Sequence, residues 1–284
     1  MQQNHKAHTR EEKLQALGRV IDVLDTLRVK CPWDAKQTNE SLRPNTIEEV
    51  YELCEALINE DNSEIRKELG DVLLHVLFYA KIGEEKEAFD IADVCDSLAE
   101  KLIFRHPHIY GNVQADTAEK VTQNWEELKL REKGGNRSVL AGVPATLPAL
   151  NKAYRIQEKA AHAGFDWKDA ADVWAKMHEE TGEFSVEAEK VRALRNNPAA
   201  TPQELQEAQE HREMETGDLF FTLVNVSRLY GVIPENALEK CNKKFIRRFN
   251  YIEECARKEG KHVKDLTLDQ MEQYWQQAKH QPQE

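Results

Sequence analysis

The feature that most constrains this chain is an acidic pattern that occurs twice. Glu-Glu-x-x-Glu occupies residues 48–52 and is followed by Glu-Leu-Gly-Asp at 68–71. The same run returns at 179–183 and is followed by Glu-Thr-Gly-Asp at 215–218. Carboxylates three residues apart project from one face of a helix. Each half of the chain can therefore present two acidic pairs from two helices, which is typical of an internal duplication.

Carboxylates that converge on one cleft repel one another unless a cation neutralises them. Oxygen-only ligand sets favour hard divalent cations such as magnesium, manganese or calcium. The sequence therefore predicts one metal site in each half. The expected ligands are Glu49, Glu52, Glu68 and Asp71 in the first half, and Glu180, Glu183, Glu215 and Asp218 in the second. A ferritin-like di-iron site would need Glu-x-x-His on two helices, and because neither acidic pattern supplies it, magnesium is favoured over iron.

Ordinary solvated helix faces are the alternative explanation for any single acidic pair. Apolar residues at 69, 72, 73, 76, 77 and 80 form one stripe of a helix, and Glu68 and Asp71 lie directly beside it. Gly70 and Gly217 interrupt helices at a cost of about 1 kcal/mol each. We expect these glycines to permit close helix approach beside the acidic pairs, which a solvated face would not require.

Helical periodicity recurs along the chain, and alternating β-branched runs of the kind that mark strands are absent from the sequence. The fold class is therefore predicted to be all-α, with a first domain at 1–135 and a second at 136–284, divided near Gly134-Gly135. The expected helices lie near 10–29, 46–60, 62–83, 88–105, 116–132, 147–163, 169–194, 202–230, 234–258 and 267–279.

Composition narrows the class of protein further. A net charge of -12 over 284 residues argues against a general nucleic-acid-binding surface. The five cysteines are scattered and lack CxxC spacing, as expected for reduced thiols in a cytoplasmic protein. No apolar run approaches the roughly 20 residues of a membrane span. We expect a soluble protein with no membrane or nucleic-acid partner.

Three further features have two interpretations each. Lys244 and Arg248 follow the second acidic pattern and could bind phosphates, or they could be the exposed side of an amphipathic helix. Trp275 could stack on a base, although its position favours a core or docking role. Cys31-Pro32-Trp33-Asp34 could have a functional role, although a structured turn with a buried indole is favoured.

Together with Lys-Cys-Pro-Trp-Asp at 30–34 and Arg-His-Pro-His at 105–108, the duplicated acidic pattern resembles the MazG family of nucleoside triphosphate pyrophosphohydrolases over about residues 10–280. The resemblance implies tandem helical-bundle domains and a homodimer in which helices from two subunits build each site. It also implies magnesium dependence, with manganese as a substitute. The implied reaction converts nucleoside triphosphates, ATP among them, to the monophosphate and pyrophosphate, as nucleotide-pool housekeeping.

The resemblance also assigns roles to residues of the second half. It implies metal ligation by Glu180, Glu183, Glu215 and Asp218, and nucleotide contacts by Lys176, Lys244, Arg248 and Trp275. Glu179 is a candidate general base or an orienter of the ligands. Asn45 stands in the first half where the second has Lys176, so the first half is interpreted as a structural or degenerate domain that keeps a second candidate metal site.

In the implied mechanism, bound metal ions bridge the triphosphate and activate a water that attacks the α-phosphorus. Two alternatives stay open. One is a non-catalytic helical module that binds a nucleotide or a partner protein through its acidic grooves. The other is a calcium- or manganese-dependent phosphohydrolase that removes only the terminal phosphate. The sequence does not identify the preferred base or sugar.

Overall fold

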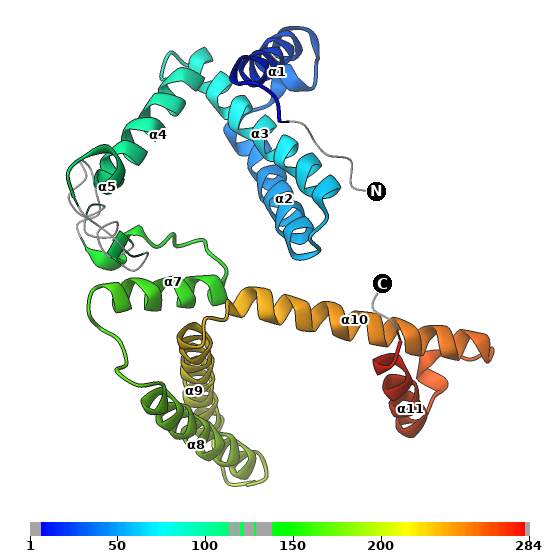
Figure 1. Ribbon diagram of the computed structural model, residues 1–284. Coiled ribbons are helices and arrows are strands. Elements are labelled where there is room, and N and C mark those ends of the chain that lie inside the picture. Colours follow the sequence, from blue (N-terminus) through cyan, green and yellow to red (C-terminus); the bar gives the residue numbers. More distant parts are fainter. Residues whose placement is uncertain (1–6, 114–116, 118–119, 122–127, 129–137, 282–284) are drawn as a thin grey trace. The chain divides into compact units, whose positions relative to one another are not determined.

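The computed structural model describes residues 7–113, 117, 120–121, 128 and 138–281. Contacts divide the chain into two compact units, Met1–Val121 and Thr122–Glu284 (Figure 1). Every regular element of the described residues is helical, which confirms the all-α prediction. The division expected after residue 135, and almost all of the helix expected near 116–132, lie outside the described residues. In the part that is described, no helix combines the length and apolar character that crossing a membrane requires.

The first unit is built on an antiparallel hairpin of two long helices, α2 and α3, with α1 and α4 packed against α3 (Figure 1). Its elements are α1 (Arg10–Lys30), η1 (Asp34–Lys36), α2 (Asn39–Ile58), α3 (Asn62–Glu85), α4 (Ile91–Arg105) and α5 (Pro107–Tyr110). The buried core consists of Leu24, Leu42, Leu77, Phe78 and Ile82. These residues come from α1, α2 and α3, so the core fixes the hairpin and leaves its acidic residues to one side.

Helix α2 begins at Asn39, so the start expected near residue 46 is wrong. Thr38 and Ser41 form a reciprocal capping box, in which each side chain accepts from the other residue's backbone N–H. This cap starts the helix upstream of Pro44, although a proline inside a helix usually interrupts it. Pro44 lies inside the helix and removes one backbone hydrogen bond there.

A buried arginine organises the turn after α1. The Arg28 side chain is 7% exposed and forms a bidentate ion pair with Glu85. Its Nε donates to Oε1 at 2.8 Å and its Nη2 donates to Oε2 at 2.5 Å. It also donates to the carbonyls of Asp34 and Gln37. The turn at 31–34 is therefore structured as expected, but its indole is not buried, because Trp33 is 58% exposed. The guanidinium, rather than the indole, holds this turn.

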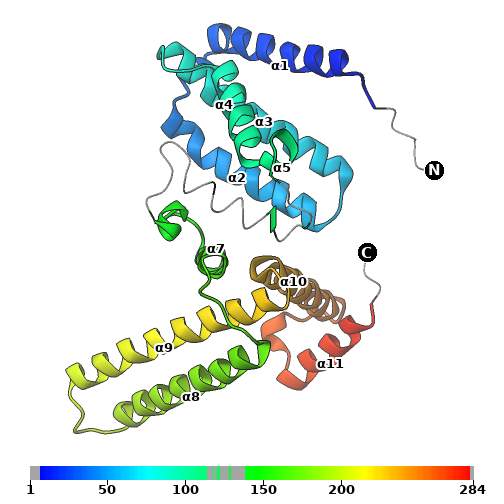
Figure 2. The ribbon, with the colours of Figure 1, turned by 60° about the vertical axis from the view of Figure 1, so that its left-hand side comes forward.

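The second unit repeats the hairpin with two longer helices, α8 and α9 (Figure 2). Its elements are η2 (Val139–Gly142), α7 (Ala149–His162), α8 (Ala170–Arg195), α9 (Pro202–Leu229), α10 (Pro234–Lys258), η3 (Val263–Asp265) and α11 (Leu268–Lys279). Helix α7 packs on α9, and α11 packs on α10. A second buried core of Ile252, Ala256 and Leu266 holds α11 to α10.

The two glycines of the acidic pattern face open space. A Cβ atom built at Gly70 or at Gly217 would meet no heavy atom of the described chain within 4 Å. The expectation that they permit close approach of neighbouring helices is therefore wrong within a single chain, because both hairpins pair through other faces. Gly83 is the tightly packed glycine of α3, since its Cβ would lie 2.8 Å from the ring of Phe89.

Candidate active site

Three carboxylates of the second half meet between α8 and α9. Glu180 and Glu183 lie one turn apart on α8, and Glu215 faces them from α9. One oxygen from each lies within 4.8 Å of the others. Asp218, the fourth expected ligand, is outside this group and lines the adjoining cavity beside Glu180. The structure thus brings together three of the four expected ligands.

The charge of this cluster is only partly balanced. Glu183 is exposed, and its pKa is raised above the ordinary value by desolvation, followed by the nearby charges of Glu180 and Glu215. Lys176 lies one turn before Glu180, and its Nζ is 2.7 Å from Glu179 and 2.8 Å from Glu180. These two bonds raise the pKa of Lys176, so it stays an ammonium ion. One ammonium cannot neutralise three or more carboxylates, and the remaining negative charge suits a divalent cation.

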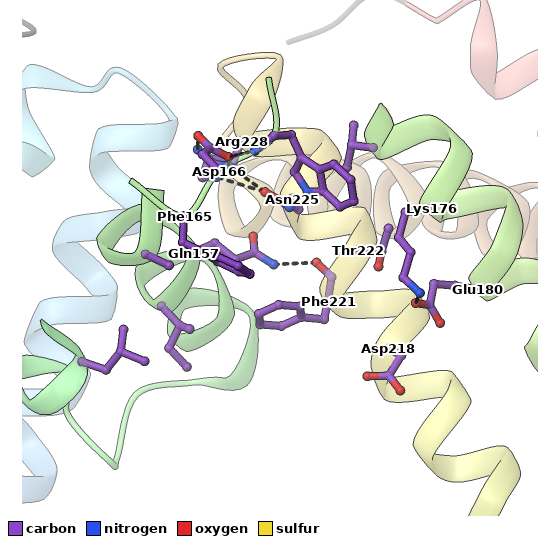
Figure 3. A pocket seen from close by; sticks show the side chains of 15 residues that line it. Gln157, Phe165, Asp166, Lys176, Glu180, Asp218, Phe221, Thr222, Asn225 and Arg228 are labelled. Carbon is purple, nitrogen blue, oxygen red and sulfur yellow. Dashed lines mark hydrogen bonds and ion pairs between the residues drawn. The ribbon is translucent and has the colours of Figure 1, made fainter. Parts of the chain in front are cut away.

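A cavity of about 720 Å³ opens beside the carboxylates (Figure 3). Its apolar walls come from η2, α7, the α7–α8 turn and the hairpin: Leu140, Ile156, Ala160, Phe165, Trp167, Val173 and Phe221. Lys176, Glu180 and Asp218 lie together at one side of the cavity. A cavity of this size with a few polar groups is typical of small-molecule sites.

The other side of the cavity carries a second polar group that the sequence reading missed. Arg228 binds both carboxylate oxygens of Asp166, one of them at 3.0 Å, and its Nε donates to Asn225 Oδ1 at 3.1 Å. Gln157 on α7 donates to the backbone carbonyl of Phe221 at 2.7 Å. The turn before α8, where an aspartate stands between two aromatic residues, was the available sequence clue to this wall.

The first half forms a similar cluster from Glu49 on α2 with Glu68 and Asp71 on α3, again with one oxygen from each within 4.8 Å of the others. Glu52 is outside this group. Burial, followed by the charge of Asp71, raises the pKa of Glu49. Glu68 is buried, and its Oε1 lies 2.7 Å from Lys67 Nζ. Its Oε2 is buried and has no hydrogen-bond partner among the described residues.

The remaining expected contacts lie elsewhere in the second unit. Lys244 is exposed on α10, and the Arg248 guanidinium stacks 5.3 Å from the ring centre of Trp275 on α11. Trp275 packs on the core of α10 and α11, which agrees with its core interpretation. None of the described residues that line the cavity comes from α10 or α11. Within a single chain, these three side chains therefore do not line the cavity beside the carboxylates.

Comparison with known proteins places this helical, carboxylate-bearing chain in a family. Residues 37–110, in the first unit, match the sequence profile of the MazG nucleotide pyrophosphohydrolase domain. A Thermotoga maritima protein named nucleoside triphosphate pyrophosphohydrolase/pyrophosphatase MazG is 41% identical over 265 residues, which cover 92% of this chain and 94% of the relative. The Escherichia coli K12 nucleoside triphosphate pyrophosphohydrolase is 36% identical over 273 residues, 94% of this chain and 98% of the relative. The chain belongs to the MazG family.

A third relative contains a similar sequence within a longer protein. The Bacillus subtilis protein YabN, which is named as uncharacterized, is 46% identical over 250 residues. These residues cover 88% of this chain but 48% of YabN. Both units of this chain therefore have counterparts in a protein that is about twice as long.

Proposed function

We propose that this chain hydrolyses nucleoside triphosphates to nucleoside monophosphates and pyrophosphate at the carboxylate cluster of its second half. The observation that carries the proposal is the meeting of Glu180, Glu183 and Glu215 within 4.8 Å, with Glu180 also lining a cavity of nucleoside size. The names of two relatives that match over nearly their full lengths support the same reaction.

The cluster fits a hard divalent cation, for which we propose magnesium, with manganese as a substitute. Glu180, Glu183 and Glu215 would hold it, and Asp218 would complete the set from the cavity side. When bound, the ion would screen the charge of the triphosphate and act as a Lewis acid toward its oxygens. The pKa of Glu183 is raised by desolvation and then by the charges of Glu180 and Glu215, and a bound cation would offset both effects.

The side chains around the cluster have separate roles in this proposal. Lys176 presents its ammonium group to the triphosphate, and Glu179, which accepts from it at 2.7 Å, positions it. The aromatic walls formed by Phe165, Trp167 and Phe221 receive the base. Water attacks the α-phosphorus, the bridging oxygen leaves with pyrophosphate, and one proton is released.

Two differences between the halves favour the second as the active one. The second hairpin borders the large cavity and carries Lys176 one turn before its first ligand. The first hairpin has Asn45 at the corresponding place, and its cluster is paired with Lys67 from the other helix. We therefore assign residues 136–284 as the catalytic domain and 1–135 as a structural domain with a second candidate cation site at Glu49, Glu68 and Asp71.

A second copy of the chain could supply the side chains that one chain does not bring to the cavity, namely Lys244, Arg248 and Trp275. Helix α9 exposes apolar side chains that one chain does not cover, including Met214, Phe220 and Leu223. Gly217 lies among them and faces open space. An apolar helix face with a glycine at its centre suits close packing of another helix. We accordingly propose a homodimer whose second subunit brings its basic pair to the site.

Product analysis tests the proposed reaction. Purified protein would be incubated with each nucleoside triphosphate and magnesium in ¹⁸O-labelled water. All phosphorylated products would then be separated and analysed by mass spectrometry. We expect monophosphate and pyrophosphate, with the label in the monophosphate, because water attacks the α-phosphorus. Diphosphate and orthophosphate would reject the cleavage position. Binding without turnover across the panel would instead indicate a non-catalytic nucleotide-binding module.

A further inference from the structure

The wall of the cavity opposite the carboxylates contains a buried acceptor without a partner. Gln157 is 5% exposed and lines the cavity from α7. Its Oε1 is buried and has no hydrogen-bond partner in the part of the chain that the structure describes. A buried polar atom without a partner is costly, and native proteins rarely keep one without a reason. A ligand that donates a hydrogen bond to this oxygen would supply that reason.

The orientation of the Gln157 amide is fixed by its neighbour. Its nitrogen donates to the backbone carbonyl of Phe221 at 2.7 Å, and a carbonyl can only accept. Turning the amide over would place oxygen against oxygen, so the acceptor must be the atom that points away from Phe221. Figure 3 shows Gln157 between Phe221 and the group formed by Asp166, Asn225 and Arg228.

Two donors of this wall already have partners. The Gln157 nitrogen is held by Phe221, and the Arg228 guanidinium is directed at Asp166 and at Asn225 Oδ1. A ligand carbonyl placed at Gln157 would therefore meet another acceptor. An amino group would instead donate to it, with its ring between the aromatic walls of the cavity.

We propose that Gln157 Oε1 selects nucleobases that carry an exocyclic amino group over their keto counterparts. This inference rests on the proposed function, since it places the base in the cavity and the triphosphate at the carboxylates. Gln157 acts as a specificity residue at a distance from the reacting phosphate. Its contact is made equally in the bound substrate and in the transition state, so its loss should raise KM and leave kcat nearly unchanged.

Substrate pairs that differ only in this group test the proposal without altering the protein. The pairs are ATP with inosine triphosphate, and CTP with UTP. The enzyme will hydrolyse either the purine pair or the pyrimidine pair faster. Within that pair, we expect kcat/KM to be roughly tenfold to a hundredfold higher for the nucleotide with the amino group. Purine riboside triphosphate carries hydrogen in place of the amino group of ATP, and its kcat/KM should be lower than that of ATP by a similar factor.

Variants then assign the preference to one residue. In Gln157→Leu the amino-to-keto ratio should fall to about one, because the acceptor is gone. Gln206→Leu is the matched control, since Gln206 pairs with Glu210 on the exposed start of α9. Its ratio should equal that of the wild type. Gln157→Met provides the same comparison with an unbranched side chain should the Leu variant unfold.

The outcomes separate this inference from the proposed function. Equal hydrolysis of amino and keto members by the wild type, or an unchanged ratio in both Gln157 variants, would overturn the role of Gln157 while the reaction stands. A preference for the keto member would overturn it as well. Absence of pyrophosphate release from every triphosphate would instead reject the proposed function.

Discussion

Replacing Glu180 by glutamine should remove the part of the magnesium-dependent stabilisation that comes from the second-half cluster, while changing the metal-free protein little. The Glu180 carboxylate lies beside Glu183 and Glu215, and its positive partner, Lys176, also binds Glu179. Without metal, removal of this charge loses part of an ion pair but relieves repulsion among the carboxylates, and the two effects offset each other. With metal, the variant lacks one ligand of the set.

The size of the effect follows from ligand linkage. Magnesium at a hundred times its dissociation constant would stabilise the folded wild type by about 2.7 kcal/mol. For a chain of this size, that free energy corresponds to a rise in melting temperature of about 5–10 °C. The rise would be measured by scanning calorimetry in EDTA and in magnesium, for the wild type, Glu180→Gln and Glu189→Gln. Glu189 is on the same helix, and its side chain is 69% exposed.

The first-half cluster could also bind magnesium, so the comparison is repeated in a Glu68→Gln background. There, only the second cluster is complete, and any remaining rise in melting temperature belongs to it. We expect the background protein to keep part of the rise and the double variant with Glu180→Gln to lose it. The assignment of the metal site to this cluster is wrong if adding Glu180→Gln leaves the rise in melting temperature unchanged, both in the wild type and in the Glu68→Gln protein.

Three further predictions concern the first unit and the dimer. Arg28 lowers the pKa of Glu85, so this pair stabilises the fold above the ordinary glutamate pKa and ceases to do so as pH falls through the lowered value. Glu85→Gln should therefore lower the free energy of unfolding at neutral pH by about 1 kcal/mol, allowing for solvent screening, and urea titrations should show no difference from wild type in strong acid. Gly217→Ala should stabilise the dilute monomer by about 1 kcal/mol, because its Cβ meets no neighbour, yet weaken dimerisation measured by sedimentation; tighter dimerisation would contradict the proposed contact. Mixing inactive Glu180→Gln and Arg248→Ala subunits should restore roughly a quarter of wild-type turnover if sites are shared between subunits, and none if each chain is self-sufficient.

The helical framework follows from local sequence. Acidic residues three apart, beside an apolar stripe, sufficed to pair the carboxylates across both hairpins, because helix periodicity fixes which side chains share a face. The start of α9 is marked by Thr201 and Glu204, which form a capping box. The start of α2 was missed because Pro44 predicts a helix break, whereas the cap at Thr38 determines where the first turn forms.

Features that depend on packing between distant segments were beyond the sequence. The cavity exists because α7 and the turn after it pack against α9. No local sequence pattern predicts that packing. Gln157 gains its significance only from the carbonyl of Phe221, 64 residues away. Gly70 and Gly217 suggested close helix packing, yet which face of a helix is covered is decided by tertiary contacts.

The most direct test of the central claim compares pyrophosphate release by Glu180→Gln and Glu68→Gln, with Glu189→Gln as the exposed control. If the second half carries the reaction, Glu180→Gln should slow release at least about a hundredfold, while Glu68→Gln and Glu189→Gln keep near wild-type rates. Loss of release in Glu68→Gln with retention in Glu180→Gln would contradict the account and move the active site to the first hairpin.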